Sequence, residues 1–167
     1  MPRVRLLLCA TLLATAPLAA QAPTATDARF TLGVVVVTQR IGELNGWGTG
    51  PQLLLGQPFG RRVVGEVALG ALLGSSGFYD FTGLVLDLGP ALAFRGPRAM
   101  ATLGVGVSAI VGGDSDGSGG GYVGPYLSGQ GTWWLVPRAG LTGRAVLRVV
   151  SSPRFAPSLA AGITFAL

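Results

Sequence analysis

Residues 81–94, FTGLVLDLGPALAF, alternate between two sets of side chains with a period of two. One set is apolar except at its first position: Thr82, Leu84, Leu86, Leu88, Pro90, Leu92 and Phe94. The other set is smaller and contains a charge: Gly83, Val85, Asp87, Gly89 and Ala91. Because successive side chains of a β-strand point to opposite faces, this period predicts a strand with one strongly apolar face.

The same alternation recurs along most of the chain. It predicts eight strands, over residues 28–39, 47–56, 62–73, 81–94, 101–111, 123–135, 139–149 and 155–167. In each of them one face is apolar and the other carries small and polar residues. Short connections between consecutive strands favour an antiparallel, up-and-down arrangement.

The composition indicates which face meets solvent. Hydrophobic residues make up 49% of the chain and charged residues only 11%, compared with roughly 25% charged in a typical soluble domain. The second face of the strands is therefore too small and too poor in charge to coat a protein in water. We expect it to line a narrow, packed lumen while the apolar face meets lipid. The predicted fold class is an all-β, eight-stranded antiparallel up-and-down transmembrane β-barrel.

The first residues have the order of a cleavable secretory signal: two arginines, an apolar run, then small residues. We expect residues 1–20 to be a Sec-type signal peptide, 21–27 a short periplasmic segment and 28–167 the barrel. After the signal, no apolar run reaches the 18 residues that a helical membrane span requires.

Catalysis, metal binding and cofactors are disfavoured by what the chain lacks. It has no histidine, and its one cysteine, Cys9, lies in the expected signal peptide. These absences remove the commonest nucleophile–base pairs and zinc ligands. The positive charges are scattered arginines with no lysine, so we expect no nucleic-acid partner. The protein is not expected to be an enzyme.

The connections predict two different ends. Three of them, containing GQPFGRR, FRGPR and LVPR, are short. RIGELNG, GSSGFYD and GGDSDGSGGG read as longer loops, with a short fourth around SSPR. Short periplasmic turns and longer extracellular loops are typical of outer-membrane barrels, and both termini then fall at the short-turn end.

Four prolines recur once per hairpin on the lipid-facing register of the even-numbered strands: Pro51, Pro90, Pro125 and Pro157. The small residue before each proline predicts a β-bulge or local bend that spares the ladder.

Aromatic residues near the strand ends predict two interfacial belts. The members proposed for these belts are Trp47, Phe94, Trp133, Trp134, Phe155 and Phe165.

Inside the barrel, the alternation gathers polar and charged side chains at middle depth. The expected cluster consists of Glu66, Asp87, Arg144, Arg148, Gln130 and Tyr126. A buried charge without a partner is strongly unfavourable, so Arg144 is expected to pair with Glu66 or Asp87 across the lumen. Such a cluster could hold a closed barrel together or could form an ion path or gate.

One phrase carries a family resemblance. GPYLSGQG, residues 124–131, is similar to the Pro-Tyr-hydrophobic-x-Gly-x-Gly phrase of small outer-membrane barrels, the OmpA-like and opacity-type, porin-fold proteins. The closing SLAAGITFAL resembles the last strand that the barrel assembly machinery recognises in that family, although Leu167 stands where Phe or Trp is usual. The resemblance implies outer-membrane localisation, contact with outer-membrane lipids and assembly by that machinery.

The resulting hypothesis is an integral outer-membrane protein of the cell envelope with a structural or surface-interaction role. Side chains plug its lumen, and its loops contact an unknown extracellular partner. One alternative is a narrow channel for ions or small solutes. Another is a secreted soluble barrel that binds a small apolar ligand.

Overall fold

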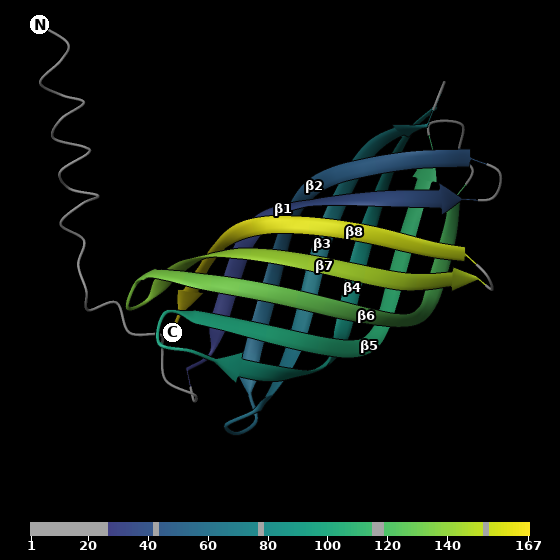
Figure 1. Ribbon diagram of the computed structural model, residues 1–167. Helices are drawn as coiled ribbons and strands as arrows, with labels where there is room; N and C mark the ends of the chain where they lie inside the picture. Colours follow the sequence, from purple (N-terminus) through teal and green to yellow (C-terminus); the bar gives the residue numbers. More distant parts are fainter. Residues whose placement is uncertain (1–26, 42–43, 77–78, 115–118, 152–153) are drawn as a thin grey trace, which may run out of the picture.

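In the computed structural model, the chain forms eight strands and a closed antiparallel barrel, β1-β2-β3-β4-β5-β6-β7-β8 (Figure 1). The structure describes residues 27–41, 44–76, 79–114, 119–151 and 154–167. The strands are β1 (Arg29–Ile41), β2 (Leu44–Pro58), β3 (Val63–Ser76), β4 (Tyr79–Arg95), β5 (Ala99–Asp114), β6 (Gly119–Val136), β7 (Ala139–Ser151) and β8 (Arg154–Ala166). The expected signal peptide, residues 1–20, lies outside the described residues. No helix in the described part of the chain is long and apolar enough to cross a membrane.

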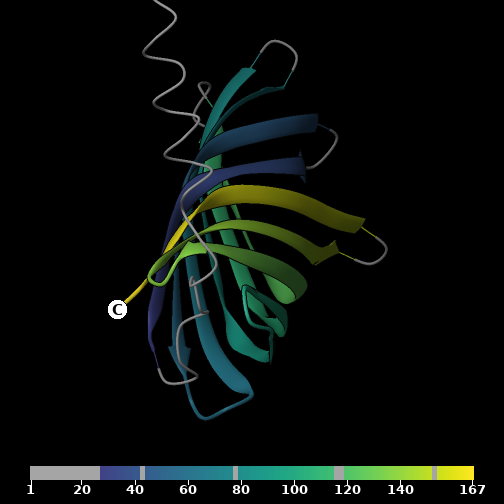
Figure 2. The ribbon, with the colours of Figure 1, turned by 60° about the vertical axis from the view of Figure 1, so that its left-hand side comes forward.

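The barrel closes by pairing between the first and last strands. β1 pairs with β8 from Arg29↔Ala166 to Val37↔Ser158, and with β2 on its other side. Figures 1 and 2 show the tilted strands wrapping into a cylinder, with the start of β1 and the end of β8 together at one end. We call this end, which also carries the turns at 59–62, 96–98 and 137–138, the turn end. The opposite end is the loop end.

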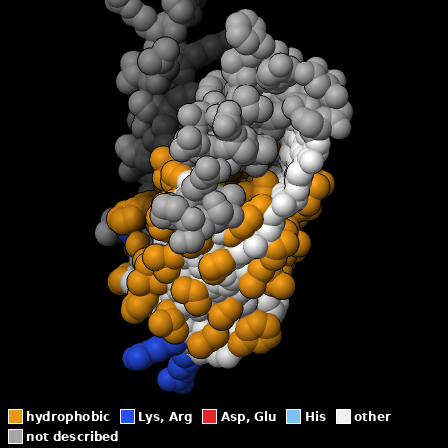
Figure 3. All heavy atoms as spheres, turned by 90° about the vertical axis from the view of Figure 1, so that its right-hand side faces the viewer, with side chains coloured by type: hydrophobic (Ala, Val, Ile, Leu, Met, Phe, Trp, Pro, Cys, Tyr) orange, Lys and Arg blue, Asp and Glu red, His pale blue; other side chains and the backbone are white. Residues whose placement is uncertain are grey.

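The outer surface is apolar and the inner surface is not. On β4, Leu88 is 57% exposed while its neighbour Asp87 is fully buried, and the same alternation runs through the other strands. On the face that Figure 3 shows, hydrophobic side chains are spread over the described wall of the barrel. The prediction that the apolar stripe faces outward is therefore confirmed. A surface of this kind is that of a membrane-embedded barrel.

The loop end differs from the prediction, because strands occupy most of the segments expected to be loops. β4 has 17 residues and β6 has 18, whereas about 9–11 residues suffice to cross a bilayer. Even the glycines that flank residues 115–118 are paired, as in Gly112↔Gly120 and Gly113↔Gly119. Glycine weakens a strand but does not prevent it, and each added pair satisfies backbone hydrogen-bonding groups.

The four prolines face lipid as predicted, since all four are exposed on the outer face, but the bulges expected at them are absent from the described ladders. Around Pro51 the β2–β3 register is unchanged, from Thr49↔Leu73 to Gln52↔Gly70. The register shifts that do occur lie elsewhere, between Trp134 and Val136 and between Val149 and Ser151.

Each of these two prolines, Pro51 and Pro90, interrupts the hydrogen-bond ladder with only one of its two neighbouring strands. Pro51 keeps its pairing with Val34 of β1, and Pro90 keeps its pairing with Gly65 of β3. The N–H of a strand residue points toward a single neighbour, so a proline removes a hydrogen bond from one ladder and leaves the other intact. No extra residue is needed, which explains the unchanged register.

The residue before these prolines must be small because the next strand approaches closely. A Cβ added to Gly89 would lie 2.1 Å from the carbonyl oxygen of Val105. At Gly50 the corresponding distance, to the carbonyl oxygen of Ala71, is 1.9 Å. The continued registers place Val105 and Ala71 opposite Pro90 and Pro51, where no N–H is available to those carbonyls. At Gly50 and Gly89, the neighbouring strand thus leaves no room for a Cβ in the residue before the proline.

We predict that Gly89→Ala lowers the free energy of unfolding by about 1–3 kcal/mol, because the new methyl group would overlap Val105 and force the strands apart. Urea unfolding of the refolded barrel in detergent micelles measures this. Gly131→Ala is the matched control, since Gly131 faces outward and has nothing within 4 Å of an added Cβ. Equal losses in the two variants would contradict the close-approach explanation.

Candidate functional site

The barrel interior has three levels of different chemistry. Nearest the loop end, an apolar cluster fills the lumen: Val35, Val37, Leu72, Val85 and Ile110, with Tyr122 and Ala160 packed against it. Charged side chains come next, around Asp87. On the turn-end side of the charged level lie the hydroxyl groups of four threonines. Each level draws side chains from several strands, which is possible because a barrel of eight strands is narrow enough for opposite walls to touch.

Asp87 is the centre of the charged level. Its carboxylate accepts hydrogen bonds from Arg144 Nη1 at 2.9 Å, from Arg148 Nη2 at 2.7 Å and from Arg148 Nε at 2.9 Å. Ser108 Oγ donates to it at 2.7 Å. Arg144 comes from β7 and Asp87 from β4, so this salt bridge spans the lumen. Of the two acids that the sequence offered as partners for Arg144, Asp87 forms the contact.

All three nitrogens of the Arg148 guanidinium donate hydrogen bonds. Besides Asp87, it donates through Nε to Ser108 Oγ at 2.9 Å and through Nη1 to Ser158 Oγ at 2.6 Å. Its side chain is completely buried. Arg148 therefore connects β7 to β4, β5 and β8.

Glu66 belongs to the interior but not to this ion-paired group. It is buried and accepts a hydrogen bond from Thr102 Oγ1 at 3.0 Å, while its second oxygen, Oε2, has no hydrogen-bond partner. Within the described residues it forms no salt bridge. Gln130 is buried close by and makes only a long contact, 3.5 Å, to Thr132.

Tyr126 supports Arg144 through its ring. The guanidinium carbon of Arg144 lies 5.9 Å from the ring centroid, within the range of a cation–π contact. The phenol oxygen of Tyr126 has no hydrogen-bond partner in the structure. The aromatic face, rather than the hydroxyl group, is thus the part of Tyr126 that contacts the charged level.

Sequence reasoning missed the threonine chain. Thr31 and Thr164 are hydrogen-bonded at 2.6 Å, Thr164 also bonds to Thr142, and Thr142 bonds to Thr132 at 2.8 Å. This chain of hydrogen bonds links β1, β8, β7 and β6. The available signal was a threonine at a lumen-facing position near the turn end of four neighbouring strands. The sequence alone could not show that these four threonines lie at the same depth, because depth depends on the register between neighbouring strands.

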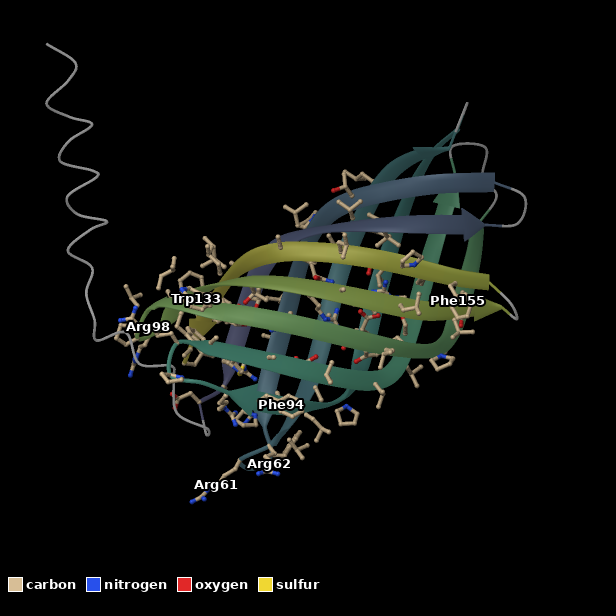
Figure 4. All side chains as sticks on the ribbon, viewed as in Figure 1. Arg61, Arg62, Phe94, Arg98, Trp133 and Phe155 are labelled. Carbon is tan, nitrogen blue, oxygen red and sulfur yellow. The ribbon has the colours of Figure 1, made fainter. Side chains whose placement is uncertain are left out.

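The belt residues divide between the two faces. Phe94, Trp133 and Phe155 are exposed on the outside, with Phe155 toward the loop end and the other two toward the turn end (Figure 4). Phe165 stacks on Phe30 with ring centroids 5.0 Å apart. The side chain of Trp47 lies outside the described part of the structure.

Trp134 was wrongly assigned to a belt. It is 2% exposed and points into the lumen, whereas Trp133 is 56% exposed. Two consecutive residues of a strand point to opposite faces, so only one of this pair can reach the lipid interface. The indole nitrogen of Trp134 has no hydrogen-bond partner.

Little space remains beside the charged level. A cavity of about 10 Å³ lies next to Arg144 and is lined by Thr31, Gln52 and Thr142 among others. That volume corresponds to about one water-sized sphere. Across the described residues, no group of three or more His, Cys, Asp or Glu side chains could hold a metal ion.

Comparison with known proteins supports the fold. The sequence matches no protein-family model and no curated protein. Among solved structures, Neisserial surface protein A superposes with a TM-score of 0.70 at 12% identity, covering 84% of this chain and 97% of that one. OprG from Pseudomonas aeruginosa gives 0.65 at 10% identity, covering 88% and 98%. Ail, the attachment invasion locus protein of Yersinia pestis, gives 0.60 at 10% identity, covering 86% and 100%.

These structures share the fold of the small OmpA-like outer-membrane barrels. The chain therefore has that fold, and its own apolar outer face is the face of a membrane-embedded barrel. Together, fold and surface are those of an outer-membrane barrel.

We predict that Asp87→Asn lowers the free energy of unfolding by about 3–5 kcal/mol, because it leaves two buried arginines without a counter-charge. Urea unfolding in lipid vesicles measures the loss. Glu66→Gln is the matched control: it removes a buried carboxylate that no arginine contacts, so we expect a clearly smaller change. A loss as large in Glu66→Gln as in Asp87→Asn would contradict the central role of Asp87.

Proposed function

We propose that the protein is a non-enzymatic outer-membrane anchor whose lumen is closed by its own side chains, with a structural or surface-interaction role. The observation that carries the proposal is the apolar cluster lying directly beside the Arg144–Asp87–Arg148 group. An ion in transit would have to shed its water against Val37, Leu72 and Ile110, which costs several kcal/mol without compensating contacts.

The charged level argues in the same direction. Both arginines hold the single carboxylate of Asp87, and a moving ion would have to break contacts of 2.7–2.9 Å. The neighbouring cavity, about 10 Å³, gives no room for a hydrated ion. A cross-linked interior of this kind favours a rigid anchor over the alternative of a narrow channel.

The loop end is the surface we propose for contact with an extracellular partner. Strands β4 and β6, with 17 and 18 residues, are long enough to extend past the membrane. Paired strand ends, rather than long loops, would then present the contact surface. A barrel of this fold can bind a ligand: a structure of Ail was solved in complex with the heparin analogue sucrose octasulfate.

The turn end and the outer wall would meet the remaining partners. Outer-membrane lipids would cover the exposed leucines and valines, with Trp133 and Phe94 at one interface and Phe155 at the other. The barrel assembly machinery would act during insertion, when β8 has yet to pair with β1. Ile163 lies on the outer face of that last strand.

Planar-bilayer recording tests the closed lumen. We expect the wild-type barrel to give no discrete current steps, and the double variant Leu72→Gly, Val85→Gly to give small ones, because it removes two side chains of the apolar cluster. Leu73→Gly, next to Leu72 but facing lipid, is the matched control and should stay silent. Wild-type steps that Arg144→Ala alters would favour the channel instead.

Extraction behaviour separates the anchor from a soluble ligand-binding barrel. With its apolar face outward, the folded protein should leave cell envelopes only with detergent and should migrate differently on gels before and after boiling. Release of the folded protein by salt or alkaline buffer alone would contradict the membrane anchor and support the soluble alternative.

A further inference from the structure

Arg144 uses only part of its hydrogen-bonding capacity. Its Nη1 donates to Asp87, but its Nε and Nη2 have no hydrogen-bond partner, although the residue is only 4% exposed. Nε–H and Nη2–H lie on one edge of the guanidinium plane and point the same way. That edge is the fork with which arginine binds anions. A buried, unpaired fork is costly unless something occupies it.

The buried charges around this fork do not balance. The charged residues buried in the described interior are three arginines, Arg29, Arg144 and Arg148, and two acids, Glu66 and Asp87. Three positive charges minus two negative charges leave an excess of one. Around Asp87 the same excess is local, because two arginines share one carboxylate. An uncompensated charge in a low-dielectric interior is strongly unfavourable.

A cavity adjoins Arg144. Thr31, Gln52 and Thr142 line it together with Arg144 itself, so it combines a positive charge with polar side chains. Its volume, about 10 Å³, is close to one water-sized sphere. Small side-chain movements would admit a monatomic anion of chloride size. A carboxylate or a phosphate, with several heavy atoms, is too large.

We propose that the barrel interior holds one chloride-sized anion on the Nε–Nη2 edge of Arg144. The anion satisfies both unpaired donors and cancels the excess buried charge. A water molecule in the same place would accept hydrogen bonds but would leave the charge unbalanced. The site lies within the wall-to-wall contacts of the lumen and does not depend on whether the barrel conducts, so it goes beyond the anchor role.

Thermal unfolding of the refolded full barrel in detergent provides the first test. Sodium chloride is titrated against sodium gluconate at constant ionic strength, so that only the anion changes. We expect chloride to raise Tm saturably by about 3–6 °C, and acetate, which does not fit, to leave it unchanged. A Tm that does not depend on the anion would overturn the proposal.

Two variants locate the effect. Arg144→Gln removes the fork and leaves Asp87 paired one-to-one with Arg148, so the variant should fold and its Tm should not respond to chloride. Arg62→Gln is the matched control, because Arg62 is an exposed arginine of the β2–β3 turn (Figure 4) and should leave the chloride response intact. A response of wild-type size in Arg144→Gln would overturn the proposed location.

Crystals of the wild-type barrel grown in sodium bromide decide the question even if Arg144→Gln does not fold. We expect an anomalous difference peak within hydrogen-bonding distance of Arg144 Nε and Nη2. A water molecule there without anomalous signal, or an ordered side chain filling the position, would overturn the proposal. Bilayer currents report on the closed lumen instead, so either proposal can fail without the other.

Discussion

Hydrocarbon offers no hydrogen-bond partner to a peptide group, and this constraint underlies the whole structure. Every strand must pair on both sides, so β1 and β8 have to meet, and their ladder from Arg29↔Ala166 to Val37↔Ser158 closes the barrel. Closure of eight strands fixes a narrow interior. The alternation of side chains then determines which residues face lipid, because each strand directs one set of side chains outward and the other into that interior.

The narrow interior explains why its charges are shared between walls. A carboxylate on β4 can reach arginines on β7 only because the barrel is a few side chains wide. Asp87 thereby replaces the water that Arg144 and Arg148 would have outside. Apolar packing near the loop end and the threonine chain near the turn end fill the remaining cross-section. At the charged level and along the threonine chain, polar contacts occupy the positions where the core of a soluble protein has apolar side chains.

The period-two pattern predicted the facing of residues well, since facing depends only on parity along a strand. Leu88 outside and Asp87 inside follow directly from the sequence of β4. Depth and partner depend on register between strands, which no single strand encodes, so the choice of Asp87 over Glu66 and the threonine chain needed the structure. Trp134 was assigned to a belt because it lies near a strand end, but its place in the alternation of β6 directs it into the lumen. The prediction of bulges at the prolines was wrong because the missing N–H of a proline removes a hydrogen bond from one ladder only.

The most direct measurement of the central claim is the accessibility of spin labels along β4. Single cysteines placed at 84, 85, 86, 88, 91 and 92 in the refolded barrel, reconstituted in vesicles, would carry the labels. The account predicts high collision rates with oxygen, which concentrates in lipid, at the even positions, and low rates with both oxygen and a water-soluble nickel complex at the odd positions. Even positions that collide mainly with the nickel complex would mean that water, not lipid, covers the apolar stripe, and would contradict the account.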